Sequence, residues 1–151
     1  MMPHQRRSPL TQMIARLLFA PALIIALGTM IKGYADTGDG FAAGVIAALA
    51  VLLQLIAFGH EEVERTLPLG AAPLTMAVGL LLSLAVAFVP TLFGRPIMTQ
   101  FPPPGAPVMH FGTLELLTAV LFDVGVFLLV LGFSVTTMRL VANIELERRL
   151  P

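Results

Sequence analysis

The chain of 151 residues contains no cysteine, only three histidines and few charged residues, which make up 12% of it. Without cysteine it forms no disulfide, no thiolate metal site and no cysteine nucleophile. Three histidines and no thiol also argue against a dense metal centre, so we expect neither a bound metal nor another cofactor. The formal net charge is zero, so no overall basic field favours nucleic acid as a partner.

The sequence also lacks the usual signatures of an enzyme. No grouping of nucleophile, base and orienting residue is visible along the chain. The glycines beside Asp39 are not followed by the lysine and the serine or threonine of a phosphate-binding loop. We therefore expect a function other than catalysis.

What the chain has in abundance is apolar sequence. Hydrophobic residues make up 57% of it, and its mean hydropathy is +0.90. A soluble domain carries about 25% charged residues, whereas here the few charges gather at the ends and between long apolar blocks. This distribution predicts an all-α, polytopic membrane protein with a single transmembrane domain over residues 1–151.

Four apolar blocks are long enough to cross a hydrocarbon core about 30 Å thick, which takes about 20 residues of helix. They cover approximately residues 10–31, 41–58, 74–93 and 112–135. Arg16 interrupts the first block, which argues against a cleaved signal peptide. Four spans place both ends of the chain on the same side of the membrane.

Lysine and arginine near the ends of the spans predict which side that is, because cytoplasmic loops carry the excess of both. One side carries Arg6, Arg7, Arg16, Arg65, Arg139, Arg148 and Arg149. The other side has only Lys32 and Arg95. We therefore expect both termini in the cytoplasm and the connection before the second span at the outer surface.

Asp123 is the most informative polar residue, because it falls within the fourth predicted span. A carboxylate at the centre of a membrane helix costs at least about 2.5 kcal/mol, so it must face protein or water, or stay protonated. One interpretation is a relay point for protons or a cation. The other is a hydrogen bond that holds two helices together.

Two further polar residues are candidates for an intramembrane path. Glu115 precedes Asp123 by eight positions, which on a continuous helix is about 80° around the axis and about 12 Å along it. Both carboxylates would then lie on one broad face, although stabilising the start of the helix is the alternative role for Glu115. Gln54 is the single polar side chain within the second span, and an interhelical hydrogen bond is its default interpretation.

The segment TGDGFAAG, residues 37–44, leads into the second span. Gly40 and Gly44 form a GxxxG pattern, and small residues at that spacing let another helix approach closely. Asp39 is placed to cap the helix and to meet its positive end. Gly38 and Phe41 complete this helix-start motif.

Two segments carry a family resemblance. The stretch GYADTGDGFAAGVIAALAVLLQLIAFG resembles the second-helix region of the MnhB/MrpB family, where the pattern is close to G-H-x-x-P-G-G-G-F-x-G-G. The stretch ELLTAVLFDVGVFLLVLGF resembles the family's E-L-x-T-A-x-x-F-D-x-G-V-x-L-x-V-x-G, which is the more specific of the two. The resemblance extends over nearly the whole chain.

The positions that match the family lie in both motifs. They are Gly33, Gly38, Gly40, Phe41, Gly44, Glu115, Thr118, Ala119, Phe122, Asp123, Gly125 and Val126. The departures fall in the first motif, where Tyr34 replaces histidine, Thr37 replaces proline, and Asp39 and Ala43 replace glycine. A role of the family's histidine or proline therefore does not transfer to this chain.

The resemblance implies an accessory subunit of a multi-subunit Mrp-type sodium/proton antiporter in the plasma membrane of a prokaryote. Its partners would be the other subunits of the complex, with sodium ions and protons as the transported species. Asp123 and Glu115 would line or support a polar path, and the region of Gly40 would pack against a partner subunit or a loop. Two alternatives are the equivalent subunit of a membrane-bound hydrogenase-type ion pump and a purely structural scaffold in the membrane.

Overall fold

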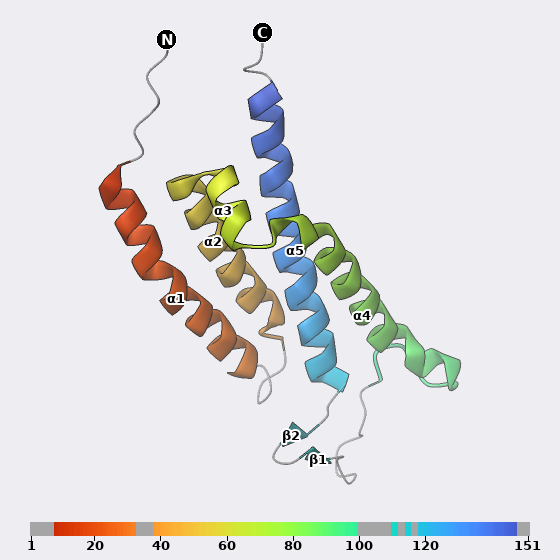
Figure 1. Cartoon of the computed structure of the whole chain (residues 1–151). Coiled ribbons are helices and arrows are strands. Elements are labelled where there is room, and N and C mark those ends of the chain that lie inside the picture. The colour runs from red at the N-terminus through yellow and green to blue at the C-terminus, as the bar shows by residue number, and fades with distance from the viewer. Residues whose placement is uncertain (1–7, 33–37, 100–109, 112–113, 116–117, 148–151) are drawn as a thin grey trace.

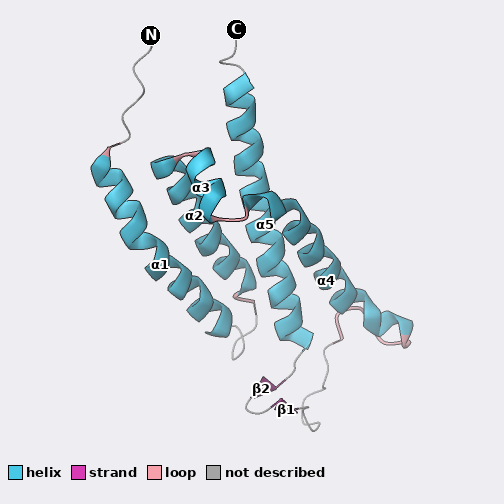
Figure 2. Ribbon diagram, in the orientation of Figure 1, coloured by secondary structure: helices cyan, strands magenta, loops and turns pink. Residues whose placement is uncertain are grey.

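The computed structural model describes residues 8–32, 38–99, 110–111, 114–115 and 118–147 of the chain. Its helices are α1 (Pro9–Lys32), α2 (Gly40–Phe58), α3 (His60–Thr66), the short 3-10 helix η1 (Leu69–Ala71), α4 (Ala72–Leu92) and α5 (Thr118–Glu147). Two short strands, β1 (His110–Phe111) and β2 (Leu114–Glu115), pair in antiparallel fashion ahead of α5. Figure 2 shows that helices dominate the described part of the chain.

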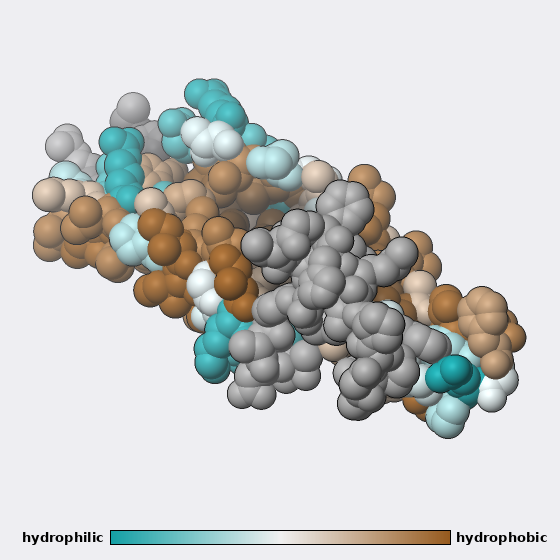
Figure 3. Space-filling view, turned by 90° about the horizontal axis from the view of Figure 1, so that it is seen from below, coloured by the Kyte–Doolittle hydropathy of each residue, from teal (hydrophilic) through white to brown (hydrophobic). Residues whose placement is uncertain are grey.

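Four helical segments are long and apolar enough to cross a membrane. They are Pro9–Lys32, Gly40–Phe58, Leu69–Leu92 and Thr118–Ala142. The shortest has 19 residues and is about 28 Å long at 1.5 Å per residue, which matches the hydrocarbon thickness. Most of the described surface visible from the end at which α2 begins is apolar (Figure 3). The prediction of four spans is confirmed.

The four long helices lie side by side in the order α1, α2, α5, α4 (Figure 1). The last helix, α5, therefore lies between α2 and α4, and α1 contacts the other long helices through α2. The start of α1 and the end of α5 lie at the same end of the molecule. The outer helices α1 and α4 expose many large apolar side chains, as surfaces that face lipid or other subunits do.

Close contact between α4 and α5 depends on glycine. A Cβ atom on Gly79 would overlap the backbone nitrogen of Leu129 and come within 2.6 Å of the Gly125 carbonyl oxygen. A Cβ atom on Gly132 would overlap the Met76 nitrogen and come within 2.8 Å of the Ala72 carbonyl oxygen. Only the absence of side chains lets the two backbones meet at this distance.

The charged run HEEVER, residues 60–65, forms most of the helix α3. Gly59 ends α2 with a φ of 91°, a conformation that favours glycine, and the chain then turns into α3. Arg139 on α5 holds this region, since its Nη2 lies 2.8 Å from Glu64 Oε1 and its Nη1 donates to the Leu69 carbonyl at 2.9 Å. Glu64 in this segment therefore helps to hold the connection between α2 and α4 against α5.

The fourth span begins later than predicted. Residues 112–117 precede α5, which starts at Thr118 and continues to Glu147. Hydropathy misplaced this boundary because Leu114, Leu116 and Leu117 extend the apolar run ahead of the helix. Short apolar runs do not distinguish a strand from a helix, and Leu114 pairs with Phe111 across β1 and β2.

Candidate functional site

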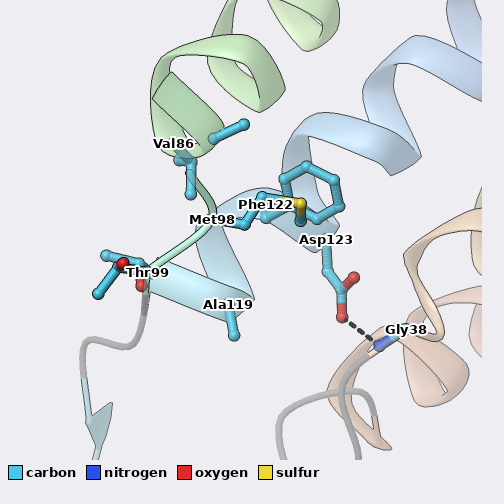
Figure 4. Close-up of a pocket in the computed structure, with 9 residues that line it drawn as sticks. Gly38, Val86, Met98, Thr99, Ala119, Phe122 and Asp123 are labelled. Atoms are coloured by element: carbon cyan, nitrogen blue, oxygen red, sulfur yellow. Dashed lines mark hydrogen bonds between the residues drawn. The ribbon is translucent and has the colours of Figure 1, made fainter. Parts of the chain in front are cut away.

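Asp123 lies in the second turn of α5, five positions after its first residue, rather than at the centre of a span. Its side chain is buried, with 6% of the residue exposed. Oδ2 accepts a hydrogen bond from the backbone nitrogen of Gly38 at 2.9 Å (Figure 4). Position near a helix end lowers the cost of a carboxylate, because polar headgroups and water are closer than at mid-membrane.

Gly38 supplies this donor because of its backbone conformation. Its φ is +121°, which residues with a side chain rarely adopt. The residue stands two positions before α2, so the Asp123 carboxylate also lies beside the positive end of that helix. Glycine at position 38, a match to the family pattern, is thus explained by the carboxylate that it binds.

A cavity of about 210 Å³ opens beside Asp123. Gly38, Ala119, Phe122 and Asp123 line it together with side chains from α4 and from the segment that follows α4. Figure 4 shows the carboxylate pointing toward Gly38, with Val86, Met98 and Phe122 gathered beside it. The cavity therefore combines one buried carboxylate with a mostly apolar wall.

The segment after α4 closes one side of this cavity. The Met98 backbone nitrogen donates to the Ala87 carbonyl at 3.0 Å, which folds the chain back onto α4. Met98 has a φ of 60°, an uncommon value for a residue with a side chain. Met98 and Thr99 belong to the run FGRPIMTQ, which resembles the segment after the family's third helix, but nothing in that run predicts that the chain folds back onto α4.

Gly40 and Gly44 pack against α5 of the same chain, and the expected contact of this region with a partner subunit or loop stays a prediction. A Cβ atom on Gly40 would overlap the Asp123 carbonyl oxygen, and one on Gly44 would come within 3.1 Å of the Phe127 carbonyl oxygen. The close-packing interpretation of GxxxG is confirmed, with α5 as the partner helix. Phe41, the residue that follows Gly40, is 60% exposed.

Glu115 lies in β2 and not on α5, so the prediction that it shares a helical face with Asp123 is wrong. Its backbone is paired with His110 of β1. The angle of about 80° assumed a continuous helix from Glu115 to Asp123, and the helix begins only at Thr118. The side chain of Glu115 lies outside the described part of the structure.

Asp39 does not cap α2 with its side chain, contrary to expectation. Its Oδ2 lies 3.2 Å from Lys32 Nζ instead, which joins the end of α1 to the start of α2. This ion pair gives Lys32 a partner at the end of α1. A carboxylate neutralised by a neighbouring ammonium adds little negative potential to its surroundings.

The family resemblance implies sodium/proton exchange, and replacing Asp39 with glycine is expected to leave the sodium concentration for half-maximal exchange within about twofold of wild type, since exposed ion pairs contribute little. Lys32→Gln is the matched variant, because it leaves the Asp39 charge unbalanced and should change the sodium dependence more. Exchange in membrane vesicles at varied sodium concentration measures both. A several-fold rise for Asp39→Gly alone would show instead that this carboxylate attracts the cation.

Gln54 makes the interhelical hydrogen bond that its position suggested. Its Nε2 donates to the Ala15 carbonyl of α1 at 2.7 Å, and 9% of the residue is exposed. The bond lies between α1 and α2, whereas Asp123 lies between α2 and α4 on the central helix. Gln54 and Asp123 therefore belong to different contacts.

Gln54→Leu is expected to destabilise the purified complex by about 0.6 kcal/mol, the average for interhelical hydrogen bonds in membranes. The sodium/proton exchange that the family resemblance implies should continue at an unchanged rate. Thermal unfolding in detergent and exchange in vesicles measure the two effects separately. Loss of exchange in a complex of normal stability would instead place Gln54 on the ion path.

Comparison with known proteins indicates the kind of protein to which the cavity beside Asp123 belongs. Residues 10–136 match the family described as a domain related to the MnhB subunit of Na⁺/H⁺ antiporters. The chain belongs to the MnhB family. This membership makes it a subunit of a transporter rather than an enzyme, in agreement with the resemblance in its second and fourth spans.

Relatives of this MnhB-family chain cover most of its length. The antiporter subunit mnhB2 of Staphylococcus aureus strain MRSA252 is 32% identical over 126 residues, which is 83% of this chain and 87% of that protein. The mnhB2 subunit of Staphylococcus epidermidis strain ATCC 35984 is 36% identical over 112 residues, which is 70% of this chain and 74% of that protein. The similarity therefore extends over the spans that build the cavity.

Proposed function

We propose that this chain is the B subunit of a multi-subunit sodium/proton antiporter and that Asp123 with its cavity forms part of the path for cations or protons. The observation that carries the proposal is a buried carboxylate in a cavity of about 210 Å³ at the end of a membrane layer. Ionisable side chains inside membrane proteins are costly and are found on ion pathways and proton relays.

The names of the relatives support an antiporter over a hydrogenase-type ion pump as the assembly. Proton-motive force would drive sodium export through the complete complex, with larger partner subunits providing the main proton channels. Four short spans supply few intramembrane charges, so this chain is necessary for exchange but not sufficient alone. Its membrane is the plasma membrane of a prokaryote.

The excess of arginine at one end of the spans supports a cytoplasmic location for both termini. The cavity beside Asp123 then opens toward the outer surface, because it lies at the end where α2 and α5 begin. In this orientation the chain offers an outer access point to the path. Lys32 and Asp39 form an ion pair at the same end.

A single-cysteine experiment tests both access and orientation, because the natural chain has no cysteine. Thr99→Cys places a thiol on the cavity wall. Ser83→Cys is the matched control, since the Ser83 side chain on α4 is buried against α5 and its hydroxyl donates to the Gly79 carbonyl at 2.9 Å. Both variants are treated with a membrane-impermeant thiol reagent in intact cells and in everted vesicles.

We expect Thr99→Cys in the assembled complex to react from outside in intact cells, and Ser83→Cys to remain unlabelled. Labelling only in everted vesicles would contradict the proposed orientation. Absence of labelling from either side, in a complex that co-purifies normally, would contradict a path open to water. Co-purifying subunits, identified in mild detergent, check that the chain is assembled in each case.

A further inference from the structure

A second cavity, of about 350 Å³, lies at the opposite end of the molecule from Asp123. It is enclosed by α1, α2, α3 and the residue that follows α3. The residues that line it include Arg16, Phe19, Phe58 and Glu62, and the Glu62 side chain is 59% exposed. It therefore brings one positive and one negative group to a hollow with aromatic walls.

Arg16 lies level with the end of α2, although it follows the first residue of α1 by seven positions. Phe58, the last residue of α2, lies beside it. An arginine at the end of the spans is at the level where lipid headgroups lie. The Arg16 guanidinium carbon lies 5.0 Å from the centroid of the Phe58 ring, which orients the group but does not neutralise it.

Glu62 faces the same cavity without neutralising Arg16. Among the ion pairs of the described residues, Glu62 Oε2 lies 3.9 Å from Arg65 Nη1, and no pair joins Glu62 to Arg16. Two opposite charges thus border one hollow with space between them. A ligand that carries adjacent negative and positive groups would satisfy both.

We propose that this cavity binds the headgroup of an aminophospholipid, with the phosphate against Arg16 and the primary ammonium against Glu62. A guanidinium matches phosphate oxygens with two parallel hydrogen bonds. The ammonium of such a lipid donates hydrogen bonds to a carboxylate, which a quaternary ammonium does not. The acyl chains would lie along α1, where Met13 and Leu17 expose 69% of their surface.

The intact complex in nanodiscs that contain a photo-crosslinkable phosphatidylethanolamine provides the test. We expect label on Phe19 or Phe58, and Arg16→Gln should weaken lipid binding at this site about tenfold, equivalent to 1.4 kcal/mol. Arg16→Lys should retain part of the binding. Lys32→Gln, which removes a positive charge from the other end of the same helix, should leave the label unchanged.

Competition identifies the ligand. Unlabelled phosphatidylethanolamine should displace the probe, phosphatidylcholine should do so about tenfold more weakly, and free inorganic phosphate should not compete. Equal competition by the two lipids would contradict the contact with Glu62, and displacement by inorganic phosphate would show a site for free anions. Equal label in Arg16→Gln and wild type, or label confined to a neighbouring subunit, would overturn the proposal.

Discussion

Replacing Gly132 with valine is expected to remove most of this chain from the assembled complex. A Cβ atom at this position would overlap the Met76 backbone nitrogen and lie 2.8 Å from both Met76 Cα and the Ala72 carbonyl oxygen. Backbone atoms of a helix do not move independently, so α4 and α5 must separate. Overpacking of this kind costs about 1–3 kcal/mol or more.

Gly28→Val is the matched control for this prediction, because no atom lies within 4 Å of a Cβ built on Gly28. Both variants add the same side chain to a membrane helix. Recovery of the tagged chain with its partner subunits in mild detergent measures assembly. Equal recovery of Gly132→Val and Gly28→Val would show that close contact between α4 and α5 is not needed for the fold.

The number of spans follows from composition because the bilayer fixes the length of an apolar helix. The predicted segments 10–31 and 41–58 agree with α1 and α2 to within one residue at each end. The start of α5 was misplaced by six residues, from 112 to 118. Hydropathy measures how apolar a residue is and not whether its backbone bonds along a helix or across a strand.

The sequence predicted the contacts of a residue in the candidate site only where those contacts depend on the spacing of residues within one helix. Gln54 and the GxxxG pattern act through helical spacing, which the sequence contains, and both pack as expected. The bond from Gly38 to Asp123 joins residues 85 positions apart. It depends on how α2 and α5 pack, and the sequence of neither segment specifies that contact.

The close contact between α4 and α5 was not predicted from the sequence, although the spacing of small residues on both helices indicates faces that can pack closely. Gly79 and Ser83 are four residues apart, and Gly125 and Gly132 are seven apart, so each set lies on one face of its helix. Small residues at those spacings are a detectable signal for helix packing in membranes. Applied to every span, the pattern would have identified faces for close packing on α4 and α5 as well as on α2, although not which of these faces meet.

Replacing Asp123 with asparagine is expected to lower the rate of sodium/proton exchange at least about tenfold, equivalent to 1.4 kcal/mol in the barrier. An asparagine side chain has nearly the same shape, and its carbonyl oxygen is able to accept the hydrogen bond that Gly38 gives to Oδ2. The substitution therefore removes the charge and keeps the contact. Asp123→Glu serves as the variant that keeps the charge and moves it.

The central claim is that the Asp123 carboxylate acts in ion exchange and not only in helix packing. It is tested most directly in a strain that lacks this chain and is complemented with wild type, Asp123→Asn or Asp123→Glu. Exchange is measured in everted vesicles and normalised to assembled complex. We predict loss of exchange in Asp123→Asn, partial activity in Asp123→Glu and normal assembly in both. Wild-type exchange by Asp123→Asn in an intact complex would contradict the account and leave a structural scaffold as the role of this subunit.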